Sequence, residues 1–109
     1  MNKSIHIIFE DKDYTLEFTR SSIQHMERNG FVADEIMTKP VTTLPVMFRG
    51  AFLSKHRYMK QEVIDRIFDK ITNKQELIGK LAELYNDPIL AMMEEPEESE
   101  GNAMWEANF

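Results

Sequence analysis

Three histidines, His6, His25 and His56, are the side chains of this sequence best suited to metal binding or proton transfer. They lie far apart along the chain, and none has a second histidine or a carboxylate at the spacing typical of zinc sites. Cysteine is absent, which excludes thiolate ligands and disulfide bonds. We therefore interpret the histidines as structural and expect no metal and no cofactor.

The other side chains that could act in catalysis lack the arrangement that catalysis needs. Asp65 and Asp69 could pair for acid–base chemistry, but their i, i+4 spacing is typical of one solvated helix face. The four glycines form no phosphate-binding loop, and the serines belong to no nucleophile motif. The sequence therefore predicts a protein that is not an enzyme.

One basic cluster, interleaved with the aromatic ring of Tyr58, could bind phosphates. It consists of Arg49, Lys55, His56, Arg57 and Lys60. Residues 1–93 hold thirteen acidic and thirteen basic residues, so the charge around this cluster is balanced. Six glutamates with no base follow in residues 94–109, and they would compete with phosphate for the cluster. A small nucleic-acid-binding regulator that uses residues 49–60 is therefore the alternative function, and docking of an acidic tail is a further use of the cluster.

Two alternating apolar runs predict a β-hairpin over residues 4–18. Each run places three apolar residues on one face of a strand. These residues are Ile5, Ile7 and Phe9 in the first run, and Tyr14, Leu16 and Phe18 in the second. Residues 10–13 form the polar link. A hairpin alone is marginal in water, so its apolar face must lie on helices, or its edge must be extended by another chain.

A short helix is expected from Thr19 to Phe31. Thr19 can cap its start, while Ser21 with Gln24 offers a competing capping box. Gly30 supplies a left-handed residue after the helix, and Phe31 would fold back as in a Schellman motif. The spacing predicts a connector over residues 32–44, with one helical turn near residues 36 and 37.

Residues 45–58 carry apolar side chains around most of a helical circumference, which predicts the central buried helix of the domain. An amphipathic helix follows over residues 59–71. Asn73 and Glu76 form a capping box for the next helix, which should end near Asn86, and Asp87 with Pro88 should begin one more short helix. Together these patterns predict an α+β fold, with a hairpin packed on four or five helices in a single domain of residues 1–93.

Residues 94–109, the acidic tail, combine a block of glutamates with Pro96 and Gly101, which predicts disorder. The tail ends in the aromatic segment, residues 103–109, where Trp105 and Phe109 are four residues apart and would share one face of a helical turn. We interpret Met104, Trp105 and Phe109, with Met92 and Met93, as a partner-binding set. A tail that only aids solubility, with incidental aromatic rings, is the alternative interpretation.

The order of these segments resembles the small tail assembly chaperone-like proteins of long-tailed phages and prophages. The resemblance spans nearly the whole chain and is carried by YTLEFTRSSIQHMERNGF, TTLPVMFRGAFLSKHR, VIDRIF, NKQELIGKLAELYNDPI and MWEANF. It implies a non-catalytic helper that binds the tape-measure protein, keeps it soluble and assists recruitment of tail-tube subunits. It also implies homo-oligomers along an extended client, and it offers no catalytic residues.

The apolar run near the N-terminus is too short for a signal peptide, and no apolar run approaches the roughly 20 residues of a membrane span. The sequence therefore predicts a soluble cytosolic protein, and the resemblance implies the cytoplasm of a bacterial host. A structural adaptor, whose hairpin edge extends a sheet in another subunit, is the third functional class that remains open. The eight methionines suit either a tolerant core or an adaptable binding surface.

Overall fold

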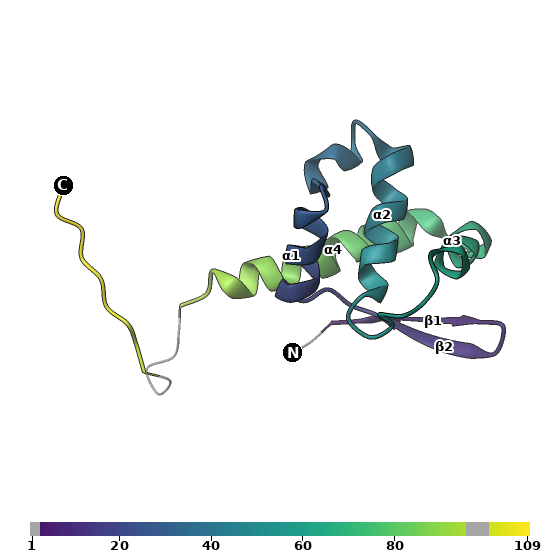
Figure 1. Ribbon diagram of the computed structural model, residues 1–109, viewed down its shortest axis with the longest axis horizontal. Helices are drawn as coiled ribbons and strands as arrows, with labels where there is room; N and C mark the ends of the chain where they lie inside the picture. Colours follow the sequence, from purple (N-terminus) through teal and green to yellow (C-terminus); the bar gives the residue numbers. More distant parts are fainter. Residues whose placement is uncertain (1–2, 96–100) are drawn as a thin grey trace.

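The computed structural model describes residues 3–95 and 101–109 of the chain. Within these residues a β-hairpin is followed by four α-helices and one 3₁₀ turn (Figure 1), so the predicted α+β class is confirmed. The elements are β1 (Ile5–Phe9), β2 (Lys12–Leu16), α1 (Arg20–Arg28), η1 (Ala33–Ile36), α2 (Pro40–Phe52), α3 (Gln61–Lys70) and α4 (Lys74–Met92).

The hairpin has the predicted alternation but a tighter turn. Glu10 and Asp11 alone form the loop, and both have positive φ values, 50° and 63°. A two-residue turn with positive φ at both positions matches the right-handed twist of the flanking strands. Ile7 therefore lies opposite Tyr14, and Ile5 lies opposite Leu16, on the face that packs against the helices.

Helix α1 has both of the predicted end signals. The backbone N–H of Ser22 donates to Thr19 Oγ1 at 3.0 Å, and the backbone N–H of Thr19 donates to Ser22 Oγ at 2.9 Å. This reciprocal capping box begins the helix at Thr19 rather than at Ser21. At the other end Gly30 has φ 91°, and the N–H of Phe31 donates to the carbonyl of Met26. The helix thus ends in the predicted Schellman motif.

Helix α2 is the central helix, but its predicted bounds, 45–58, are wrong. The helix begins at Pro40 and ends at Phe52, so Pro45 lies inside it. Pro45 cannot bond the carbonyl of Val41, one turn earlier. Val41 is exposed in the first turn, where water can satisfy this carbonyl.

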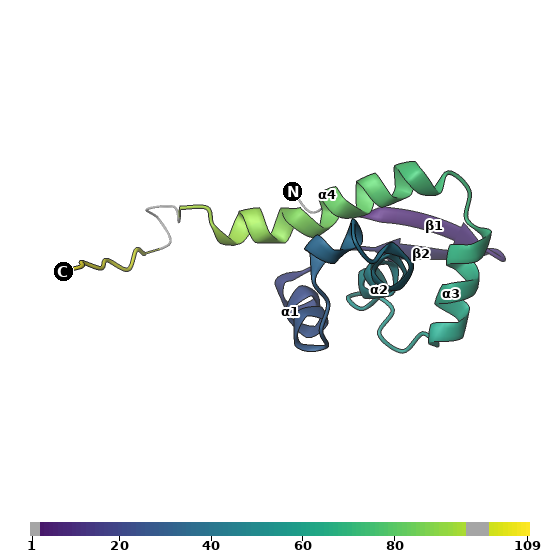
Figure 2. The same ribbon diagram turned by 90° about the horizontal axis from the view of Figure 1, so that it is seen from above.

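Helix α2 contacts more elements than any other helix. It packs against α1, α3, α4, η1 and β2, and Figure 2 shows it between α1 and α3 with α4 along one side. Phe48 and Phe52 are its largest buried side chains, and their rings meet edge to face with centroids 5.2 Å apart. Phe52 also contacts Tyr14 of the hairpin, and Phe48 contacts Phe68 of α3. The aromatic centre of the core is therefore built on this helix.

Helix α4 differs from the prediction at two places. Asn73 has a left-handed backbone, and its side-chain amide donates to the Glu76 carboxylate at 2.6 Å, so it does not accept the backbone N–H bond of a capping box. The helix also continues through Asp87 and Pro88 to Met92, so the predicted break near residue 86 is wrong. Leu84 and Tyr85 before Pro88, and Ile89 after it, pack on the same core, which favours a continuous helix.

If Phe52 holds the core together, Phe52→Ala should lower the free energy of unfolding by about 3 to 5 kcal/mol, because it leaves a cavity among rings that are fully buried. Tyr58→Ala is the matched control, since Tyr58 is 93% exposed and its loss should cost less than about 0.5 kcal/mol. Urea denaturation of both variants measures the difference. Equal stabilities would contradict the central role of α2.

Tyr85 lies in a second aromatic cluster between α1 and α4, where its ring meets those of Phe18 and Phe31 edge to face. Burial, and after it the nearby Glu27 carboxylate, raises the pKa of the Tyr85 hydroxyl above the usual tyrosine value of 10.0. The unfolded chain therefore loses this proton at a lower pH than the folded chain does. The folded state should lose stability as the pH rises from about 10 through the raised pKa.

Tyr85→Phe removes this proton and isolates the effect. The free energies of unfolding of the wild type and the variant should run parallel below about pH 9, and above about pH 10 the wild type should lose stability relative to the variant. Denaturant titrations at about pH 8 and about pH 11 measure the two differences. A difference that does not change with pH would show that the Tyr85 proton is not linked to folding.

Candidate protein-binding surface

The two halves of α4 have different surroundings. Leu81, Leu84 and Tyr85 are buried against the rest of the domain. Beyond Pro88 the helix extends past the body (Figure 1), and large apolar side chains become exposed. Leu90 is 64% exposed and Met93 is 73% exposed. The far end of α4 is therefore an apolar surface that the domain itself does not cover.

Two hollows flank this end of the helix, one on each side of Pro88. The larger, about 590 Å³, lies toward the hairpin, and its lining combines apolar side chains such as Leu84 and Leu90 with charged ones such as Asp87. The smaller, about 330 Å³, lies toward α1 and is lined in part by Ile23 and Met92. Apolar side chains on the helix thus border spaces large enough to accept side chains of another protein.

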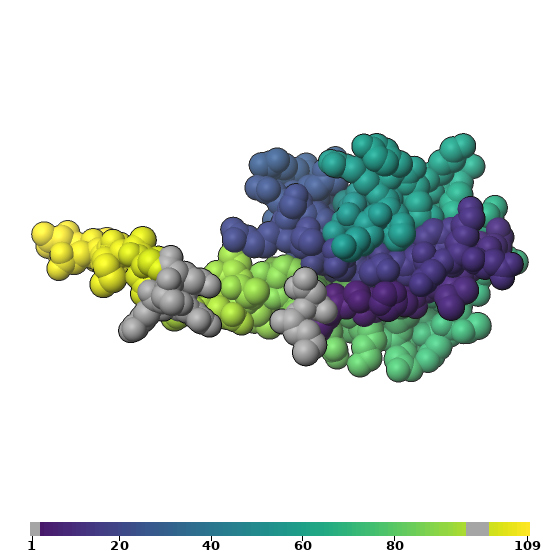
Figure 3. Space-filling view, turned by 90° about the horizontal axis from the view of Figure 1, so that it is seen from below, coloured from purple at the N-terminus to yellow at the C-terminus, as the bar shows by residue number. Residues whose placement is uncertain are grey.

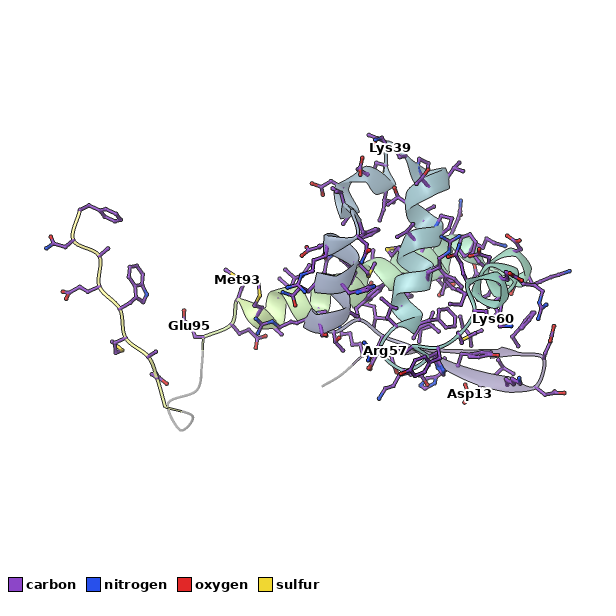
Figure 4. All side chains as sticks on the ribbon, viewed as in Figure 1. Asp13, Lys39, Arg57, Lys60, Met93 and Glu95 are labelled. Atoms are coloured by element: carbon purple, nitrogen blue, oxygen red, sulfur yellow. The ribbon has the colours of Figure 1, made fainter. Side chains whose placement is uncertain are left out.

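The aromatic segment lies beyond this surface in the chain. Every residue from Gly101 to Phe109 is exposed and outside regular secondary structure. Met104, Trp105 and Phe109 all present their apolar side chains to solvent, and Trp105 is 85% exposed. Met92 and Met93, the other members of the predicted partner-binding set, are also exposed, and Met93 projects from the end of α4 in Figure 4. The prediction of disorder for residues 96–100 falls outside the described residues.

The side chains of the predicted basic cluster contact different partners and do not form one group. Arg49 donates two hydrogen bonds to the Asp65 carboxylate, at 2.8 and 2.9 Å, and so joins α2 to α3. Lys55 lies 4.0 Å from the Glu17 carboxylate. Arg57 and Lys60 are exposed in the stretch between α2 and α3 (Figure 4). Two of the five basic side chains therefore have an acidic partner, which weakens the case for one continuous phosphate-binding surface.

His56 has a structural role, through a contact that the sequence did not indicate. Its Nε2 accepts a hydrogen bond from the backbone N–H of Thr15, at 3.0 Å, on the outer edge of β2. The ring also meets that of Tyr14 edge to face, with centroids 5.4 Å apart. Residues 15 and 56 lie 41 positions apart, so no local pattern could reveal this contact. His56 therefore closes the edge of a strand.

The remaining candidate residues form no recognisable chemical site. His6 Nδ1 lies 3.3 Å from Thr15 Oγ1, on the exposed face of the hairpin, and His25 is exposed on α1. Among residues 3–95 and 101–109 no three histidine or acidic side chains are grouped so that they could hold a metal ion. In the same residues no helix is both long and apolar enough to cross a membrane.

A family model matches residues 1–109, the whole of the sequence. The chain belongs to the family described as a domain of unknown function, DUF5055. No curated protein and no solved structure matches the chain. Family membership therefore assigns no activity, and the surface at the end of α4 carries the functional argument.

Leu84 and Leu90 of α4 offer a matched test of this surface. Leu84→Ala should lower the free energy of unfolding by about 2 to 5 kcal/mol, because Leu84 is buried. Leu90→Ala makes the same chemical change at an exposed position and should cost less than about 0.5 kcal/mol. Thermal or urea denaturation compares them. A large loss for Leu90→Ala would mean that the far end of α4 belongs to the core.

Proposed function

We propose that this protein is a non-catalytic tail assembly chaperone of long-tailed phages or prophages. It acts in the bacterial host cytoplasm, binds the tape-measure protein as a homo-oligomer and assists assembly of the tail tube. The proposal joins the resemblance of the segments quoted above to one structural observation. That observation is the uncovered apolar surface at the end of α4, formed by Leu90, Met92 and Met93, followed by the exposed aromatic segment.

Uncovered apolar surface of this kind supports binding to another protein. Contiguous apolar patches on small domains commonly mark interaction sites, and buried aromatic rings commonly dominate interface energies. The methionines at the end of α4 have flexible side chains that can adapt to different segments of an extended client. Glu94 and Glu95 beside them are exposed and would steer the surface toward basic partners.

Two of the side chains that could act in catalysis are engaged in structural contacts, which supports a binding role. Asp65, one of the two carboxylates considered for acid–base chemistry, is held by both hydrogen bonds from Arg49. His56 is held between the edge of β2 and the ring of Tyr14. These contacts stabilise the domain and leave the apolar surface as its most prominent functional feature.

Co-expression with the tape-measure protein tests the proposal. The full chain should keep the client soluble and co-purify with it. Deletion of residues 94–109 should leave the domain folded, as measured by circular dichroism, but weaken client binding by more than about tenfold. Trp105→Ala alone should account for much of that loss, while Asn108→Ala, another truncation of an exposed side chain in the same segment, should have little effect. A client that is equally soluble without this protein would contradict the proposal.

Trp105 is the only tryptophan of the chain, so its fluorescence reports on the aromatic segment directly. At a concentration at which the chain is monomeric, saturating client should shift its emission to shorter wavelength, because the indole would leave water for an apolar pocket. Emission that stays typical of an exposed indole, while the client binds, would remove the aromatic segment from the binding surface and leave only the end of α4.

A further inference from the structure

The two edges of the hairpin are closed to different degrees. Because Phe9 and Lys12 flank a two-residue turn, the main-chain groups of His6 and Ile8 on β1, and those of Asp13 and Thr15 on β2, point away from the partner strand. On β2 the Thr15 N–H donates to His56 Nε2, and the Glu17 N–H donates to the carbonyl of Ala51. Helix α2 and the residues after it therefore close this edge of the hairpin from Thr15 to Glu17.

Among the described residues no main-chain bond closes the edge of β1, although helix α4 lies along it (Figures 2 and 3). Within the part of the chain that the structure describes, no other main-chain group bonds the outward N–H groups of His6 and Ile8. No proline, lysine, arginine or acidic side chain interrupts Ile5–Phe9, in which His6 is the one titratable residue, and Ile8 is 78% exposed. Proline, charge and covering elements are the usual devices that prevent an edge from pairing. The edge of β1 is thus free to accept another strand.

Helix α4 runs beside this open edge. Figures 2 and 3 both place α4 along β1, and Lys3 just before the strand forms an ion pair with Asp87 of α4 at 3.5 Å. A strand added to β1 would extend the sheet toward the helix. It would then need an apolar face for the helical side and a polar face for solvent.

The aromatic segment has this pattern. Apolar residues alternate with more polar ones at a period of two, as in a strand with one apolar face. The apolar set is Ala103, Trp105, Ala107 and Phe109, and the alternate set is Met104, Glu106 and Asn108, of which Met104 is itself apolar. The segment has no regular secondary structure of its own, so its main-chain groups are available for pairing. Seven residues also suffice to pair along the five residues of β1.

We infer that the aromatic segment of a second copy of this chain adds to the open edge of β1 as a third strand. A second copy is favoured over the same chain because Asp87 lies level with the start of β1, and α4 then continues away from the hairpin (Figure 1). The segment of the same chain lies away from its own hairpin, and every one of its residues is exposed (Figure 1). Reciprocal exchange between two copies gives a closed dimer, whereas one-way exchange gives longer assemblies.

The purified full chain, without any client, is sufficient for the test. Its mass is measured by light scattering over a dilution series, and shielding of Trp105 is measured by acrylamide quenching. Ala107→Asp and Asn108→Asp add the same charge to opposite faces of the proposed strand. Ala107→Asp should raise the dissociation constant of the oligomer by about tenfold or more, and Asn108→Asp should leave it nearly unchanged.

Variants of the acceptor edge complete the test. Ile8→Pro removes an outward N–H without removing a bond between β1 and β2, so it should also weaken association by about tenfold or more, while Ile8→Thr should not. Circular dichroism confirms that the variants are folded. The aromatic segment is exposed, so its own substitutions cannot act through unfolding of the domain.

Four results would overturn the inference. They are a monomer at every concentration, equal effects of Ala107→Asp and Asn108→Asp, unchanged association in a folded Ile8→Pro variant, and a monomer in which Trp105 is shielded. Equal effects of Ala107→Asp and Asn108→Asp would favour a helical turn, in which position 107 leaves the face of Trp105 and Phe109. A monomer in which Trp105 is shielded would place the segment on the hairpin of its own chain. Each leaves client binding, which is measured separately, untouched.

Discussion

The burial of two phenylalanine rings on α2, Phe48 and Phe52, is the interaction on which the domain depends. A two-stranded hairpin is marginal in water and needs an apolar surface to cover its inner face. Phe52 supplies that surface by contact with Tyr14, and Phe48 extends the same cluster to Phe68 of α3. The bond from the Glu17 N–H to the carbonyl of Ala51 attaches the end of β2 to the same turn of the helix. Strands and helices therefore stabilise one another around α2.

The size of this core explains why apolar surface remains exposed. Helix α4 has 19 residues and is about 28 Å long, whereas its buried residues end at Tyr85. The core covers the first half of the helix and leaves the last turns to solvent. The two edges of the hairpin also differ. The Thr15 and Glu17 N–H groups beside β2 are bonded by His56 and α2, whereas no main-chain group among the described residues bonds the outward N–H groups of β1. Two of the uncovered places in the described residues thus border α4.

The candidate surface could be predicted in part from the sequence. Trp105 and Phe109 were recognisable because large aromatic rings follow a run of glutamates and have no neighbouring apolar pattern to pack with. The basic cluster was less predictable, because neighbours in sequence need not share a surface. Arg49 reaches Asp65 on the next helix, and His56 turns to the hairpin. These partners lie 16 and 41 positions away, and only the fold brings them together.

Elements fixed by short-range contacts were determined by the sequence itself. The alternation of the hairpin, the cap at Thr19 and the turn at Gly30 depend on residues no more than a few positions apart, so their chemistry is visible in the chain. The sequence did not determine how Pro45 and Pro88 are used, because a proline can stand in the first turn of a new helix or inside a longer one. Packing of the flanking residues decided in favour of continuous helices at Pro45 and Pro88. Only the tertiary structure could decide this, because the apolar contacts that offset a lost backbone hydrogen bond come from distant elements.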